Sequence, residues 1–316
     1  MSFHNFVVSA ARSVRPGLVL CLVALLLLGG GCKGRGTLAT DPVAGTREVT
    51  DEGGRKLVVA QKVDRVVSLA PSLTEIVFAI GAQDQLVGDT SYCDYPEAAK
   101  KIAKVGDTIR PNIEAIVALH PQVVLVSTSS QLEEFTQQMR DQRIAVYVTD
   151  PKDLDGLFRT IVNVGDLLGV RANAVQVVEK LRVRSNAVEA KVKDKPPVKV
   201  FFQVSREPLY TAGRDSYLTD LMRRAGGDSV TAKVPGAWPN FSAEAALAAR
   251  PEAIIMTTGD SMGGKINSIV AESLLKSPAV ENKRVYEING DLLSRPGPRL
   301  VDGLEQMARV LHPDAF

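Results

Sequence analysis

Two stretches, NIEAIVALHPQVVLV (residues 112–126) and SAEAALAARPEAIIM (residues 242–256), repeat one pattern and decide the fold. Each begins with a short polar residue suited to a helix N-cap and carries a glutamate two places later. Each then runs through apolar residues to a proline seven positions after the glutamate. The run after each proline is apolar on both faces, which is typical of a strand covered by helices on both sides. The chain therefore predicts two copies of one helix-strand unit.

The repetition extends outward from this unit. LTEIVFAIGA, from Leu73, matches LTDLMRRAGG, from Leu218, in residue type and order. Strand-like runs precede these helices and follow the glutamate units: RVVSLA from Arg65, VKVFFQV from Val198, IAVYVTD from Ile144 and KRVYEIN from Lys283. The expected order in each copy is strand, helix, helix, strand, helix, strand, which implies crossover connections and parallel sheets.

A long helix is predicted between the two copies. From Arg171 to Lys193 a helical pattern runs about 23 residues without glycine or proline, and Pro196 follows. Such a helix would span about 35 Å, enough to bridge two lobes. We therefore expect an α/β fold of two Rossmann-like lobes with parallel sheets (47–168 and 196–316), joined by a single long α-helix (169–195). A ligand site is expected in the cleft between them.

The N-terminus is typical of an export signal. Two arginines precede an apolar run of 11 residues, Leu18 to Leu28, which is well short of the roughly 20 that a membrane-spanning helix needs. We predict a signal peptide over 1–31. The protein is then exported to the periplasm or the cell surface.

Three glycines and Cys32 follow the apolar run and resemble the bacterial lipobox, although Gly29 stands where leucine is preferred. The resemblance implies that Cys32 is acylated and anchors the protein to a membrane. Cleavage by an ordinary signal peptidase after Gly31, giving simple secretion, is the alternative. Residues 32–46 are predicted to form a lipid-anchored flexible tether.

Composition argues against several function classes. The net charge of +2 gives no basic field for nucleic acid. Only three histidines occur, which disfavours histidine catalysis and a multi-histidine metal site. If the mature chain begins at an acylated Cys32, Cys93 is its single free cysteine. We therefore expect an unpaired thiol at Cys93, with no disulfide and no metal site. Residues His120 and His312 each precede a proline and are interpreted as structural.

Enzyme motifs are missing from the sequence. There is no G-x-x-x-x-G-K-[ST] phosphate loop and no G-x-S-x-G nucleophile motif, and SLAPSLTE stands where a dinucleotide fingerprint would follow the first strand. We therefore expect a binding protein without enzymatic activity or a resident cofactor.

The repeated glutamates have a local explanation and a functional one. In the first turn of a helix a glutamate stabilises the helix dipole by about 0.3–1 kcal/mol. That accounts for one glutamate but explains less well why Glu114 and Glu244 occupy the same place in both copies.

Several motifs in order resemble the cobalamin and ferric-siderophore binding proteins of ABC importers, and most closely the cobalamin branch. They are RVVSLAPSLTEIVFAIGA, VGDTSYCDYP, the first glutamate unit and RPGPRLVDGLEQMARVLHP, and the resemblance extends from about Thr46 to Phe316. It implies a monomer that holds a corrinoid in its cleft and delivers it to a permease dimer with ATPase subunits. It also implies that Glu114 and Glu244 pair with arginines of the two permease subunits.

The resemblance assigns five ligand-contacting positions: Tyr92, Tyr210, Trp238, Asp291 and Arg295. Aromatic side chains in rigid loops suit a large flat ligand, and Asp291 with Arg295, in a Gly/Pro-rich loop, could bond the amide fringe of a corrin. Alternatively Trp238 is a packed loop anchor, and the two charged residues form a loop ion pair.

This chain departs from the cobalamin branch at two positions. Thr108 and Ser127 stand where that branch has tryptophan, so the ligand could be another corrinoid or a different chelate. A ferric siderophore, bound by Arg206, Arg214 and Arg295, and haem, bound through Tyr92 or Tyr210, remain alternatives. A passive adhesin or receptor subunit is a third class, but it would not require matched docking glutamates.

Overall fold

The structure, a computed structural model, describes residues 45–127, 132–258 and 270–316. The predicted signal peptide, Cys32 and nearly all of the predicted tether lie outside the described residues. No helix in the described part of the chain is both long and apolar enough to cross a membrane.

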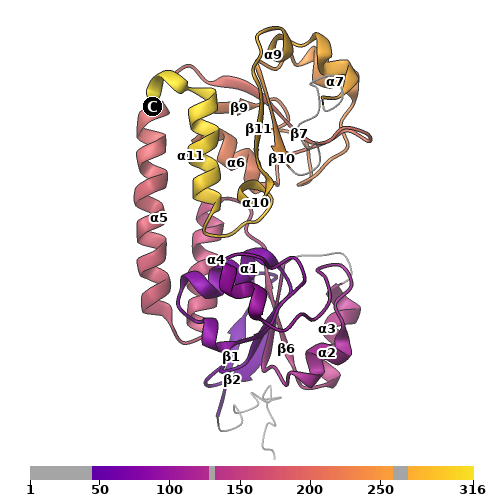
Figure 1. Cartoon of the computed structure of the whole chain (residues 1–316), viewed down its shortest axis with the longest axis vertical. Helices are drawn as coiled ribbons and strands as arrows, with labels where there is room; N and C mark the ends of the chain where they lie inside the picture. The colour runs from indigo at the N-terminus through magenta and orange to yellow at the C-terminus, as the bar shows by residue number, and fades with distance from the viewer. Residues whose placement is uncertain (1–44, 128–131, 259–269) are drawn as a thin grey trace, which may run out of the picture. The chain divides into compact units, whose positions relative to one another are not determined.

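The first lobe is built on a parallel sheet with strand order β4-β3-β5-β6 (Figure 1). An antiparallel hairpin of β1 and β2 precedes it. The elements are β1 (Thr46–Thr50), β2 (Lys56–Ala60), β3 (Val66–Ser68), α1 (Pro71–Ala79), η1 (Gln83–Gln85), β4 (Leu86–Gly88), η2 (Glu97–Lys101), α2 (Ile113–Ala118), β5 (Val123–Ser127), α3 (Leu132–Asp141) and β6 (Ala145–Thr149).

The second lobe repeats this plan. Strand β7 pairs in parallel with β9 and β10, β10 pairs in parallel with β11, and β8 adds an antiparallel edge. The elements are β7 (Val198–Ser205), β8 (Tyr210–Thr211), α6 (Tyr217–Arg224), β9 (Gly227–Ser229), α7 (Ala243–Ala248), β10 (Ala253–Thr258), η3 (Glu272–Lys276), α9 (Pro278–Glu281), β11 (Val285–Asn289), α10 (Gly290–Leu293), α11 (Leu300–Leu311) and η4 (Pro313–Ala315).

The expected α/β class with parallel sheets is confirmed, but the expected element order was incomplete. Strands β4 and β9 each follow the first helix of their lobe and pair with the first strand of its parallel sheet, β3 and β7. Each has only three residues, too few to show a period, which is why the sequence did not reveal them.

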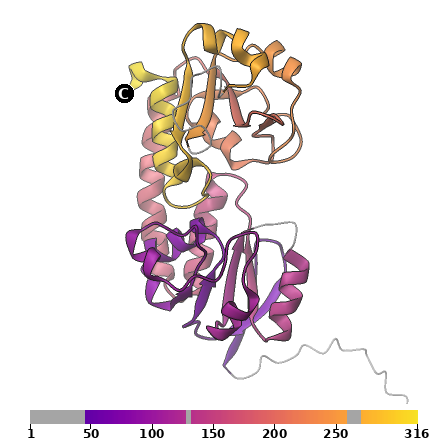
Figure 2. The ribbon, with the colours of Figure 1, turned by 45° about the vertical axis from the view of Figure 1, so that its right-hand side comes forward.

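Two long helices follow the first lobe's sheet, and one of them joins the lobes. Of the two, α5 (Arg171–Val192) is the helix that runs along both lobes, while α4 (Leu154–Leu167) belongs to the first lobe and packs against α5, as does α11 of the second lobe (Figures 1 and 2). A Cβ at Gly165 would lie 2.4 Å from the Cβ of Ala174, so the close approach of α4 to α5 requires glycine. Helix α5 lies where the long helical pattern predicted it.

The backbone confirms the internal repeat. Non-glycine residues with left-handed φ occur in matched pairs in the described chain: His120 (47°) with Arg250 (50°), and Arg143 (59°) with Lys283 (58°). Each lies between a helix and the next strand. Such φ values are uncommon outside glycine, so their recurrence reflects one shared plan rather than chance.

The cores follow from the apolar strands. Val123, Val124 and Leu125 on β5 are fully buried, as are Ile254 and Ile255 on β10. Side chains of a strand point alternately to its two faces, so burial of consecutive residues means that both faces are covered. The carboxyl ends of these strands are the edges where loops are free to build a site.

Candidate ligand-binding cleft

A cavity opens among loops of both lobes. Ser127 ends β5, Asp150–Lys152 follow β6, Asp215–Tyr217 lead into α6, and Ser294 follows α10. Its lining is completed by Ala237, Trp238 and Pro296. Parallel α/β sheets bind ligands at the carboxyl ends of their strands, and both lobes contribute such ends here.

Of the five predicted ligand residues, Trp238 is the one that lines this cavity. The residue is 43% exposed. Its ring stands edge-on to Tyr217, with ring centroids 5.9 Å apart and an interplanar angle of 81°. The Tyr217 hydroxyl donates to the Leu293 carbonyl at 2.9 Å, and burial raises the pKa of this phenol. Tyr217 is thus a fixed neutral support beside the half-exposed tryptophan.

Tyr210 lies on the segment next to Trp238. The Thr211 N–H donates to the Pro239 carbonyl at 3.1 Å, and the Gly213 N–H donates to the Ala237 carbonyl at 3.0 Å. A Cβ at Gly213 would lie 2.3 Å from the Gly236 carbonyl oxygen, so only glycine permits this pairing. The structure therefore brings the Tyr210 and Trp238 loops together.

Tyr92 lies on the 89–96 loop of the first lobe and is 56% exposed. The neighbouring Cys93 is buried and unpaired, as predicted, and its Sγ lies 3.2 Å from the hydroxyls of Thr74 and Thr90. Burial raises the pKa of this thiol, which disfavours the reactive thiolate form.

Asp291 and Arg295 form the ion pair that was the alternative interpretation. Arg295 Nη2 lies 2.7 Å from Asp291 Oδ1, and Asp291 lies in the one-turn helix α10 rather than in a loop as expected. Arg295 Nη1 also lies 2.6 Å from Asp94 Oδ1 and 3.4 Å from Glu75 Oε1, both in the first lobe. The arginine is therefore partnered across the lobes.

Glu75, the acid of the first LTE motif, is 3% exposed and receives a second arginine. Arg299 donates to it from Nε at 2.9 Å and from Nη2 at 2.6 Å. The guanidinium carbon of Arg299 also lies 3.9 Å from the ring centroid of Tyr95. A bidentate pair with ring stacking fixes the second lobe on α1 of the first.

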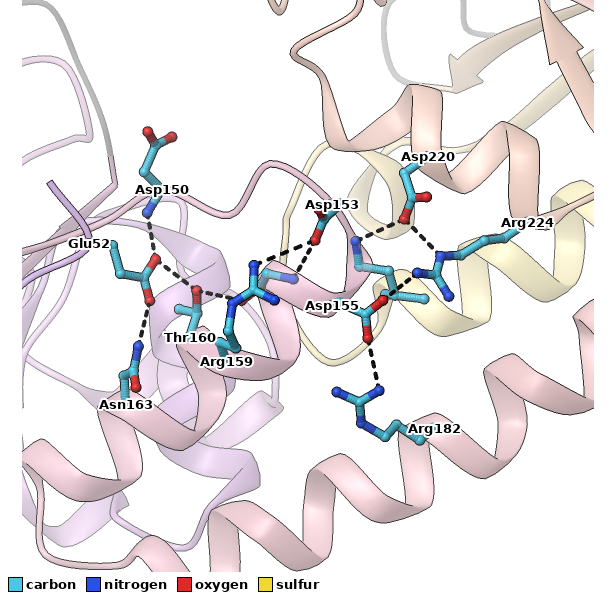
Figure 3. Close-up of polar contacts among 12 residues, drawn as sticks. Glu52, Asp150, Asp153, Asp155, Arg159, Thr160, Asn163, Arg182, Asp220 and Arg224 are labelled. Carbon is cyan, nitrogen blue, oxygen red and sulfur yellow. Dashed lines mark hydrogen bonds and ion pairs between the residues drawn. The ribbon is translucent and has the colours of Figure 1, made fainter.

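Asp220, the acid of the matching LTD motif, also reaches the other lobe (Figure 3). Its Oδ2 accepts the Leu154 N–H at 3.1 Å and Arg224 Nε at 2.7 Å. Arg224 donates onward to Asp155 and Glu189, each at 2.6 Å. The sequence showed that these acids repeat, but it did not show that both join the lobes.

The two repeated glutamates occupy equivalent exposed sites. Asn112 and Ser242 cap their helices as predicted, accepting the N–H of Ala115 at 2.9 Å and of Ala245 at 3.2 Å. Glu114 and Glu244 lie exposed in the first turns of α2 and α7. The geometry is compatible with a docking role and with local stabilisation of each helix.

Asp89 is fully buried beneath the Tyr92 loop. Its Oδ1 lies 2.7 Å from Lys104 Nζ, while its Oδ2 has no hydrogen-bond partner within the described ranges. Burial raises the pKa of this carboxyl to about 6, although Lys104 acts in the opposite direction. These surroundings favour the protonated carboxyl below about pH 6.

The raised pKa makes a prediction for stability. The protonated Asp89 carboxyl contributes fully to the free energy of unfolding below pH 3.8, and this contribution is lost as the pH rises through about 6. Relative to an Asp89→Asn variant, the wild type should therefore lose up to about 3 kcal/mol of unfolding free energy over this window. Urea unfolding of both proteins across the window measures the difference, and parallel stability curves would contradict it.

The fold and the cleft define a two-lobed solute-binding protein. Residues 66–292 match the family model described as periplasmic binding protein, and the chain belongs to that family. Among the described side chains no group of three or more His, Cys, Asp and Glu could hold a metal ion.

Three similar proteins indicate the range of the family. An uncharacterized ABC transporter substrate-binding lipoprotein, YvrC of Bacillus subtilis, is 30% identical over 85% of this chain and 86% of its own length. The crystal structure of the periplasmic vitamin B12-binding protein BtuF of Vibrio cholerae is 26% identical, with a TM-score of 0.69 over 80% of this chain and 98% of that one. The apo periplasmic heme-binding protein RhuT of Roseiflexus sp. RS-1 is 25% identical, with a TM-score of 0.71 over 80% and 100%.

Proposed function

We propose that this protein is the substrate-binding protein of an ABC importer and that it captures a corrinoid in the cleft. The observation that carries the proposal is Trp238, an exposed ring supported by Tyr217 within a cavity lined by both lobes. A supported aromatic face gives broad contact with a flat ligand at a small loss of conformational entropy. Similarity to the vitamin B12-binding protein supports the same ligand class.

The charges around the cleft favour a ligand without strong net charge. Lys152 pairs with Asp150 at 2.7 Å, Arg214 with Asp215 at 3.3 Å, and Arg295 with three carboxylates. An anionic ferric siderophore would have to compete with these carboxylates for each cation. An amide-bearing periphery can instead bond to the pairs without separating them.

Haem is the second candidate. Tyr92 and Tyr210 are 56% and 37% exposed, so either phenol could approach an iron centre. Similarity to the heme-binding protein RhuT supports this alternative.

We infer that the protein is exported, is anchored through Cys32 and docks on its permease through Glu114 and Glu244. The N-terminal sequence supports export, and the similarity to a substrate-binding lipoprotein supports the anchor. The matched exposure of the glutamates on α2 and α7 supports one contact from each lobe to a two-fold symmetric permease.

Calorimetric titration of the soluble body, from about Thr37, tests the ligand class. Cyanocobalamin, cobinamide, haem and a ferric siderophore are titrated in turn while the visible spectrum of each is followed. We expect one-to-one binding of a corrinoid, weakened about tenfold or more by Trp238→Ala, since buried aromatic anchors dominate such contacts. Val183→Ala, at an exposed position on α5, should leave the affinity unchanged.

The four ligands also separate the alternatives. Binding of haem or siderophore with no response to either corrinoid would overturn the corrinoid and keep the transport role. Absence of binding to all four ligands would contradict the proposed ligand classes altogether.

A further inference from the structure

The 89–96 loop is a part of the first lobe that contacts the second lobe, and it carries Tyr92, which is proposed to contact the ligand. Its outward side chains are Tyr92, exposed, Asp94, paired with Arg295, and Tyr95, stacked on Arg299. The exposure of Tyr92 and both contacts with the second lobe thus depend on the position of one short segment without regular secondary structure.

The inward side of the loop is fastened to the lobe. Cys93 and Thr90 are buried against Thr74, whose hydroxyl donates onward to Ser68. The Ser91 N–H donates to the Gly106 carbonyl at 2.9 Å. Most of these groups are small and neutral, and each contributes only a modest amount of stability.

Lys104 is the exception, because its single ammonium group contacts two places in the loop and one place beyond it. Its Nζ lies 2.7 Å from Asp89 Oδ1 at the start of the loop and 3.1 Å from the carbonyl of Cys93 in the middle. The third contact, at 3.0 Å, is to the carbonyl of Ala99 in η2 beyond the loop.

The contact to the Cys93 carbonyl has a direct consequence for function. Cys93 is flanked by Tyr92 and Asp94, and its carbonyl belongs to the peptide that joins it to Asp94, so this contact holds the backbone between the two side chains in place. Bonds from a charged donor are about twice as strong as neutral ones, and this donor lies beside a buried carboxylate. Removal of the Lys104 ammonium would therefore remove the strongest hydrogen bonds that hold the loop.

We propose that Lys104 is a positioning residue that fixes the 89–96 loop from beneath, so that Tyr92 is presented to the ligand and Asp94 to Arg295. The ligand part of this inference rests on the proposed function, whereas the ordering of the loop does not. Lys104 touches neither ligand nor partner and acts through the residues that it holds.

Hydrogen exchange of the ligand-free protein tests the ordering. Lys104→Met should speed exchange of the Ser91 and Cys93 amides about tenfold or more, while amides of β5 and α5 keep their protection. The matched control is Lys100→Met, which removes an exposed lysine that pairs with Glu97 at the surface and should change none of these rates. Unchanged exchange in the 89–96 loop would overturn the proposal whatever ligand the protein binds.

A double-mutant cycle tests the route to the ligand, with cyanocobalamin as the probe. Lys104→Met should weaken binding about tenfold in the wild-type background but less than about twofold in a Tyr92→Ala background, because the effect passes through Tyr92. Equal weakening in both backgrounds would mean a general structural role and would overturn the positioning role. If cyanocobalamin does not bind, the proposed ligand fails while the exchange result still decides the ordering.

Lys104→Arg guards against a variant that does not fold. It keeps a cation beside Asp89, but its planar head changes the geometry toward the two carbonyls. We expect faster exchange of the loop amides than in the wild type, with the global stability kept. Wild-type exchange rates in this variant together with a folded, fully protected Lys104→Met would contradict the proposal.

Discussion

Charge reversal at both Glu114 and Glu244 is expected to abolish the stimulation of the importer's ATPase by this protein. The two carboxylates lie exposed in the first turns of α2 and α7, one in each lobe. Each exposed ion pair with a permease arginine contributes only about 0.2–1 kcal/mol. Reversal has a larger effect than neutralisation because it places like charges opposite each other, which costs several kcal/mol.

The assay compares single and double reversals in liposomes that contain the cognate permease. Glu114→Arg or Glu244→Arg alone should leave partial stimulation, since the other lobe still docks. A matched control, Glu97→Arg with Glu281→Arg, changes the net charge equally at exposed acids outside the two glutamate units and should stimulate normally. Normal stimulation by the double variant at 114 and 244 would refute the docking role and leave only the contribution of the two glutamates to the helix dipoles.

Arg224→Met is expected to lower the free energy of unfolding by about 3 kcal/mol. The arginine side chain is 12% exposed and contacts Asp155 on α4, Glu189 on α5 and Asp220 on its own helix (Figure 3). Its removal leaves Glu189 without its arginine, and it leaves Asp155 and Asp220 only the more exposed Arg182 and Arg223 as counter-charges. The side chains of Asp155 and Glu189 are 38% and 34% exposed, so solvent reduces the effect below that of a fully buried cluster.

Urea unfolding of the two proteins measures this loss. Arg223→Met is the matched control, because Arg223 is adjacent, pairs with the same Asp220 and is 62% exposed. Its loss should be about 0.5 kcal/mol, as for other surface pairs. A loss below about 1 kcal/mol for Arg224→Met would show that the cluster contributes little to holding the lobes together.

The cluster also has a pH signature. Arg224 lowers the pKa of Asp155 and of Asp220 through direct hydrogen bonds, although burial acts in the opposite direction on both. Carboxyls with lowered pKa stabilise the fold above their unfolded pKa, and this contribution disappears as the pH falls through the folded value. The loss caused by Arg224→Met should therefore shrink in acid.

Much of the architecture could be predicted because it is encoded locally. Apolar runs after Pro121 and Pro251 indicated strands buried on both faces, and β5 and β10 are such strands. Asn112 and Ser242 indicated helix starts because a cap bonds within three residues of itself, and both caps form. The absence of breakers between Arg171 and Lys193 indicated the long helix, which ends at Val192.

The candidate site was predicted less completely. Trp238 lines the cavity, but its support Tyr217 was missed, although a signal was available in the aromatic residue directly before the LTD motif. Asp291 and Arg295 were correctly grouped by their spacing of four. The pairing of Arg295 with Glu75 and Asp94 was not foreseen, because those residues lie 220 and 201 positions away in the chain.

The sequence by itself determined two α/β copies and a bridging helix, since capping, periodicity and breakers act over a few neighbouring residues. Only the tertiary structure decided what the repeated acids do. Glu75 meets Arg299, 224 positions away, and Asp220 meets the N–H of Leu154, 66 positions away. The partner of a charge depends on which loops the packing of the sheets and helices brings together, and no local pattern records that choice.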